Sequence, residues 1–149
     1  MTTVTTRPDP DADAIRRMVE GRVAAVRDKD VAALMAQCAP DILSFDVVSP
    51  LRRQGASALR QRMEDWFAAY DGPIRLEYRD LEVVTDGDLG FCHGLQRSIG
   101  TLVGGRHADM WVRLTLCLRR IEGRWLVVHQ HLSDPFDPES GLAEIALEP

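Results

Sequence analysis

Residues 74–133 carry the strongest structural signal in the chain and read IRLEYRDLEVVTDGDLGFCHGLQRSIGTLVGGRHADMWVRLTLCLRRIEGRWLVVHQHLS. Within them, four runs have the composition and alternation of β-strands: 74–85, 88–102, 107–121 and 124–133. The short segments between the runs, Asp86-Gly87-Asp88, Gly104-Gly105 and Glu122-Gly123, are favourable hairpin turns. Strands joined this tightly must be antiparallel, so the sequence predicts a long meander.

Helical periodicity precedes the meander. The first helical run has one apolar stripe, formed by Ile15, Met18, Val19, Val23 and Val26. Asp11 or Asp13 can cap its start, and residues 1–12 are expected to form a flexible arm because they show no apolar period. A second, short helix is expected to begin at Asp30 and to end before Pro40, because the residue before a proline disfavours helical geometry.

A strand pair and a third helix complete the pattern. Residues 42–48 (ILSFDVV) predict a strand, and the following turn predicts a short return strand before Gly55. The third helix is expected to stop at Asp71-Gly72-Pro73. Its apolar stripe consists of Leu59, Met63, Trp66, Phe67 and Tyr70. This order predicts an α+β domain over residues 13–136, in which helices cover one face of a curved, mostly antiparallel sheet, and a C-terminal tail over 137–149.

Composition narrows the function classes. The chain has 149 residues, 45% of them hydrophobic, and a net charge of −5. A disordered chain would be less hydrophobic, so we expect a folded protein. A nucleic-acid-binding protein would need a basic face, so we do not expect nucleic-acid binding. The sequence has no apolar run long enough to span a bilayer and no secretory pattern at the N-terminus. The three separated cysteines fit a reduced, cytoplasmic protein, and no nucleotide-binding or nucleophile-elbow motif occurs.

Two polar residues stand among apolar neighbours on the predicted strands. Asp46 follows Phe45 and precedes Val47, where desolvation would make its carboxylate a usable general base. The alternative is that Asp46 only binds turn amides at a wet edge. His93 alternates with Leu89, Phe91 and Leu95 and could orient a ligand or move a proton, or could be an ordinary core histidine.

His129 and His131 form an H-x-H pattern that places both imidazoles on one strand face. They could bind zinc if Asp109 or His107 supplied a third ligand, or they could pack on a sheet face or in a dimer interface. Arg113 shares a face of its strand with Trp111 and could bind an anion or pair with an acid. The opposite face of that strand, which includes Leu116, must be core or cavity wall.

Three stretches resemble the nuclear transport factor 2-like superfamily, in particular its ketosteroid isomerase and SnoaL-like (polyketide cyclase) branch. They are Arg27-Asp28-Lys29-Asp30-Val31 with Leu34, Ala39-Pro40-Asp41 leading to Phe45-Asp46 and Gly55, and residues 123–133. The resemblance spans residues 14 to about 136. It implies a cone-shaped fold, in which a strongly bent mixed sheet and three helices enclose an apolar pocket, and a homodimer without a cofactor.

The resemblance also suggests roles for individual residues. Asp46 falls on the general base of the isomerases, whereas the family's oxyanion-hole Tyr and protonated Asp are replaced here by Arg22 or Val23 and by Leu116. The alignment turns His93 and three residues of the last strand, Val128, Gln130 and Leu132, toward the pocket. A bulge could exchange the two faces of that strand.

The leading hypothesis is therefore a cofactor-free isomerase, cyclase or lyase acting on an apolar carbonyl compound. Asp46 would move the proton, and His93 or Gln130 would stabilise the developing negative oxygen. The carbon skeleton would contact Met63, Trp66, Phe67 and Tyr70, with Leu116 and Val128 also on the wall. The alternatives are a non-catalytic binding or association module and a metal site at His129 and His131.

Overall fold

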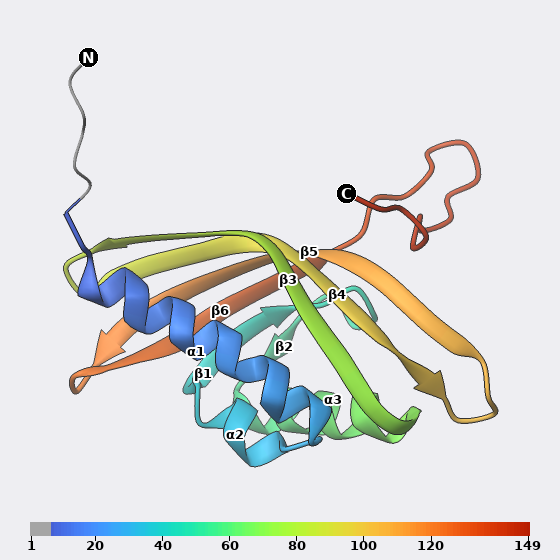
Figure 1. Ribbon diagram of the computed structural model, residues 1–149, viewed down its shortest axis with the longest axis horizontal. Helices are drawn as coiled ribbons and strands as arrows, with labels where there is room; N and C mark the ends of the chain where they lie inside the picture. Colours follow the sequence, from blue (N-terminus) through green and yellow to red (C-terminus); the bar gives the residue numbers. More distant parts are fainter. Residues whose placement is uncertain (1–6) are drawn as a thin grey trace.

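Three helices lie on one side of a curved, six-stranded sheet in the computed structural model, which describes residues 7–149 (Figure 1). The helices are α1 (Pro10–Arg27), α2 (Val31–Met35) and α3 (Ala56–Ala68). The strands are β1 (Cys38–Phe45), β2 (Arg53–Gln54), β3 (Tyr70–Asp86), β4 (Leu89–Leu102), β5 (His107–Ile121) and β6 (Arg124–Ser133). Their order is β2-β1-β6-β5-β4-β3, and every pair except β1–β6 is antiparallel. The predicted α+β fold and the meander are confirmed.

Helix α1 begins earlier than the sequence suggested. Its cap is Asp9, whose Oδ1 accepts hydrogen bonds from the backbone N–H groups of Asp11 and Ala12 at 3.0 and 3.2 Å. Pro10 occupies the first helical position, where its missing N–H costs nothing. Residues 10–12 are therefore helical rather than part of an arm, and residues 1–6 of the expected arm lie outside the described part of the chain.

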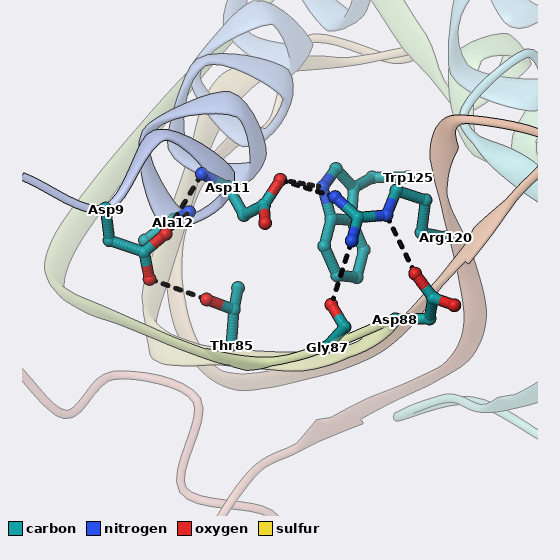
Figure 2. A network of polar contacts seen from close by, with 8 residues as sticks. All are labelled: Asp9, Asp11, Ala12, Thr85, Gly87, Asp88, Arg120 and Trp125. Atoms are coloured by element: carbon teal, nitrogen blue, oxygen red, sulfur yellow. Dashed lines mark hydrogen bonds and ion pairs between the residues drawn. The ribbon is translucent and has the colours of Figure 1, made fainter.

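Hydrogen bonds join the start of α1 to the C-terminal ends of β3 and β5 and to the N-terminal end of β6 (Figure 2). Asp11 pairs with Arg120 of β5 at 2.8 Å and accepts from the Trp125 ring of β6 at 3.3 Å. Arg120 also pairs with Asp88, in the β3–β4 turn, at 2.9 Å and lies over the Trp125 ring. The Thr85 hydroxyl donates to Asp9, so helix, turn and sheet are joined by one polar network.

The boundaries around β1 and α3 differ from the predicted ones. Asp30 caps α2 as expected, but β1 begins at Cys38 and contains Pro40. Proline is tolerated there because the β1–β6 register is irregular between Cys38 and Leu43. Strand β1 ends at Phe45, so Asp46 lies just beyond the strand. Tyr70 opens β3 opposite Leu102 rather than ending α3.

A bulge in β6 sets which side chains face the helices. Leu118 of β5 lies opposite Val127, but the next residue, Cys117, lies opposite His129, so Val128 is an extra residue. Val127 and Gln130 are consequently both buried toward the helices. His129 and His131 are turned to the opposite face of the sheet.

The helices and the inner face of the sheet form two apolar clusters. The larger lies under α1 and includes Ile15, Val19, Ile42, Leu114, Leu116, Leu118 and Val127. The smaller lies toward the end of α1 and includes Val26, Leu34, Phe67, Ile74 and Leu76. Among the described residues, no helix combines the length and the apolar character needed to cross a membrane.

Candidate functional site

A cavity of about 100 Å³ lies between the helices and the inner face of the sheet. Most of its wall is apolar: Val26, Leu34, Val47, Met63, Trp66, Tyr70, Leu76, Met110, Val112, Leu114 and Leu132. The other seven lining residues are Arg22, Asp46, Arg62, Tyr78, Gln96, Ser98 and Gln130, and Trp66 and Tyr70 also have a polar atom each. Val47, one of the lining residues, is 36% exposed. An apolar hollow with a few inward polar groups is typical of a small-molecule site.

Asp46 lines this cavity, and its side chain is only 1% exposed. It is held by two arginines. Its Oδ2 accepts a hydrogen bond from Arg62 Nε at 2.8 Å and lies 3.6 Å from Arg53 Nη1, while its Oδ1 accepts from the backbone N–H of Val47 at 2.7 Å. The carboxylate therefore has a fixed position, and its single negative charge faces two guanidinium groups.

The residues predicted to form the wall of the pocket, Met63, Trp66, Phe67 and Tyr70, are divided between α3 and the start of β3. Met63, Trp66 and Tyr70 line the cavity, but Phe67 belongs to the smaller apolar cluster instead. Neighbouring residues on a helix point about 100° apart, so Phe67 cannot share the inward direction of Trp66. Tyr70 fits against β4 because residue 100 is glycine: a Cβ there would lie 2.8 Å from the Tyr70 ring.

On the sheet side, Gln130 lines the cavity and donates from Nε2 to Ser44 Oγ at 3.1 Å. Two other predicted wall residues do not reach it. Leu116 is fully buried in the larger apolar cluster, and Val128 is the extra residue of the β6 bulge. The inward residues of β5 at the cavity are instead Met110, Val112 and Leu114.

His93 lies on the outer face of the sheet, so the prediction that it faces Asp46 is wrong. Its side chain is 48% exposed, with Nε2 3.5 Å from Glu82 Oε2. The residue that faces inward is its neighbour Cys92, which is fully buried. Alternation misled the prediction because Leu89 and Phe91, which share the outer face with His93, are apolar yet exposed.

His129 and His131 also lie on the outer face, with ring centroids 6.2 Å apart and both rings edge-on to Phe45. His129 Nδ1 contacts the Leu43 carbonyl at 2.8 Å. The suggested third ligand Asp109 is bound by Arg97 through two bonds of 2.7 and 2.8 Å. Over residues 7–149, no three side chains of the metal-binding types are grouped to hold an ion.

The face of β5 that carries Trp111 and Arg113 is likewise directed away from the cavity. The Arg97 guanidinium lies over the Trp111 ring, with 5.7 Å between Arg97 Cζ and the ring centroid. Arg113 donates to the Ser133 hydroxyl at 3.0 Å. Neither residue contributes to the cavity wall.

Two residues that the sequence analysis did not assign to the site form a second polar part of the cavity wall. Arg22 is only 8% exposed, and its Nε donates to Gln37 Oε1 at 2.7 Å. The Tyr78 hydroxyl is buried and meets no hydrogen-bond partner among the described residues. Burial raises the pKa of Tyr78 to about 12, although the nearby Arg22 guanidinium acts in the opposite direction. One signal was available: Arg22 continues the stripe of Ile15, Val19 and Val26, where a charge is unusual.

Comparison with known proteins places this geometry in context. Residues 15–137 match the family model described as a SnoaL-like domain. An NTF2-like protein of unknown function from Pseudomonas putida KT2440 is 33% identical, with a TM-score of 0.86 over 97% of this chain and 100% of that chain. A ketosteroid isomerase-like protein from Erwinia carotovora atroseptica SCRI1043 is 17% identical, with a TM-score of 0.72 over 85% and 97% of the two chains. A search of curated proteins gave no match.

Proposed function

Because the chain belongs to the SnoaL-like domain family, we propose that its cavity binds a small, largely apolar carbonyl compound and that the protein catalyses proton transfer beside the carbonyl. An isomerase, cyclase or lyase would use such a step. The observation that carries this proposal is Asp46, a buried carboxylate on the wall of an otherwise largely apolar cavity. The likeness to a ketosteroid isomerase-like protein supports the same reaction type.

The proton transfer follows from the positions of three groups. One Asp46 oxygen would take the proton from the carbon next to the carbonyl, and the electron pair of that C–H bond would move to form an enolate. Gln130 has a second N–H in addition to the one bound to Ser44, and it would donate to the enolate oxygen. The Arg62 and Arg53 guanidinium groups would keep the base oriented.

Hydrogen–deuterium exchange tests this reaction without knowledge of the natural substrate. Acetophenone in deuterated buffer is followed by NMR, and the protein should accelerate loss of its methyl protons. The variant Asp46→Asn should lose this acceleration by a hundredfold or more, the order expected for a general base. Asp41→Asn, an exposed change on strand β1 just before Asp46, is the matched control. Equal exchange with wild type and Asp46→Asn would refute Asp46 as the base.

A non-catalytic binding module is the second candidate, and the Asp46 ion pairs favour it. Both carboxylate oxygens already accept hydrogen bonds, so a purely structural role, in which Asp46 holds Arg62 and the Val47 amide, accounts for its burial without any reaction. A pure binding protein would bind acetophenone in a calorimetric titration yet leave its exchange rate unchanged. Binding and exchange measured on the same sample therefore separate the two candidates.

A further inference from the structure

The Arg22 side of the cavity contains a charge that the fold does not balance. Arg22 is buried, and no acidic side chain among residues 7–149 lies within ion-pair distance of it. The other charged lining residues, Asp46 and Arg62, neutralise each other. The cavity wall thus has one positive charge in excess. A buried charge without a partner is costly, so such a site stabilises a ligand of opposite sign.

The guanidinium is held in place before any ligand arrives. Arg22 Nε donates to Gln37 Oε1 at 2.7 Å, and Gln37 Nε2 in turn donates to the Met18 carbonyl at 2.8 Å. These bonds fix the plane of the guanidinium and use only Nε. The two terminal nitrogens remain able to donate, and their geometry suits a carboxylate.

Tyr78 supplies a second donor beside Arg22. Its hydroxyl is buried beside the Arg22 guanidinium, which lies near enough to act on the phenol oxygen as a weak donor, but the hydroxyl proton meets no acceptor among the described residues. Tyr78 and Arg22 both line the cavity, and the Arg22 guanidinium is close enough to act on the Tyr78 phenol, so the two groups form one polar corner of the wall. The phenol remains protonated at neutral pH and acts as a donor.

We propose that Arg22 and Tyr78 form a subsite for a carboxylate, so that the natural ligand is a small, largely apolar organic acid bound as a monoanion. This inference rests on the proposed ligand cavity and adds an anchoring group to the carbonyl compound named above. The carboxylate is held at Arg22, which leaves the ligand's reactive carbonyl for Asp46 and Gln130. The two free terminal nitrogens of Arg22 and a cavity of about 100 Å³ favour a planar carboxylate over the larger phosphate.

Calorimetric titration with benzoate and benzamide tests the subsite, because the two probes have nearly the same shape and differ in charge. At pH 7 benzoate should bind at least tenfold more tightly to the wild-type protein. The variant Arg22→Met should remove this preference, and Arg17→Met, the same change on the exposed face of α1, should retain it. Tyr78→Phe should weaken benzoate binding severalfold with little loss of stability, because the hydroxyl proton has no acceptor in the free protein.

Each outcome decides the matter. Equal affinity for the two probes would overturn the carboxylate subsite, and so would a benzoate preference that survives both Arg22→Met and Tyr78→Phe. If Arg22→Met does not fold, the Tyr78→Phe titration alone decides. Acetophenone exchange that depends on Asp46, together with no benzoate preference, would refute the subsite and leave the proposed function standing. No binding of benzoate, benzamide or acetophenone would refute both.

Discussion

The ion pair between Asp46 and Arg62 should contribute measurably to folding, and a double-mutant cycle can isolate its contribution. The changes are Asp46→Asn, Arg62→Gln and the two combined. The Asp46 and Arg62 side chains are only 1% and 16% exposed, and the bond that joins them is 2.8 Å long. Exposed pairs contribute about 0–1 kcal/mol, whereas breaking a fully buried pair costs about 3–5 kcal/mol. For this intermediate burial we expect a coupling free energy of about 2 kcal/mol.

The cycle is measured by urea denaturation followed by tryptophan fluorescence. Asp46→Asn alone should cost about 3 kcal/mol, because it leaves Arg62 and Arg53 without their counter-charge. In a domain of this size that corresponds to a fall in Tm of about 6–12 °C. Arg27 and Asp28 provide a matched control, since they also lie 2.8 Å apart but are more than half exposed. Their cycle should show no measurable coupling. A coupling between Asp46 and Arg62 as small as that of the control pair would refute the reasoning.

Four further predictions concern Tyr78, Gly100, Arg120 and the oligomeric state. Burial raises the pKa of Tyr78 to about 12, so as the pH rises the phenol ionises in the unfolded chain before it ionises in the folded one. This difference should lower the free energy of unfolding by about 3 kcal/mol between pH 10 and about 12, with no such loss below pH 10. Alkaline denaturation of Tyr78→Phe should show a shallower pH dependence, and an identical one would contradict the buried phenol. Gly100→Ala places a Cβ 2.8 Å from the Tyr70 ring and should cost about 1–3 kcal/mol and weaken ligand binding, as measured by urea denaturation and calorimetry; unchanged values would mean that the ring moves freely. Arg120→Met should lower hydrogen-exchange protection at the start of α1 and in the β3–β4 turn, with α3 unaffected; uniform protection would show that the network of Figure 2 is not required there. The homodimer expected from the family should give twice the chain mass of 16.7 kDa in light scattering, and a single-chain mass would disprove it.

The sequence predicted the sheet better than the site. Turn residues at 86–88, 104–105 and 122–123 determined the meander, because glycines there adopt positive φ angles that other residues avoid. Asp46 and Gln130 were placed at the cavity correctly. Both follow from the pattern of the chain together with the resemblance to a known family.

The misplaced residues have a common physical cause. His93 was assigned inward because its alternate neighbours are apolar, yet the outer face of this sheet is itself apolar at Leu89 and Phe91. The composition of a face therefore did not distinguish inside from outside. Arg22 and Tyr78 belong to segments 56 residues apart along the chain, and only the packing of α1 on β3 shows that they line one cavity.

Because Val128 is an extra residue, the residues of β6 that face the cavity depend on the register in which β6 pairs with β5. Suppose that the part of β6 after Val128 shifted its pairing with β5 by one residue, so that His129 lay opposite Leu116. The imidazoles of His129 and His131 would then face the cavity in place of the Gln130 amide. The cavity would then hold two titratable bases and lose its amide donor. The polar groups of the cavity thus depend on the hydrogen-bonding register of β6 as well as on its amino acids. A substitution that removed the bulge opposite Leu118 would change which polar groups face the cavity without replacing a lining residue.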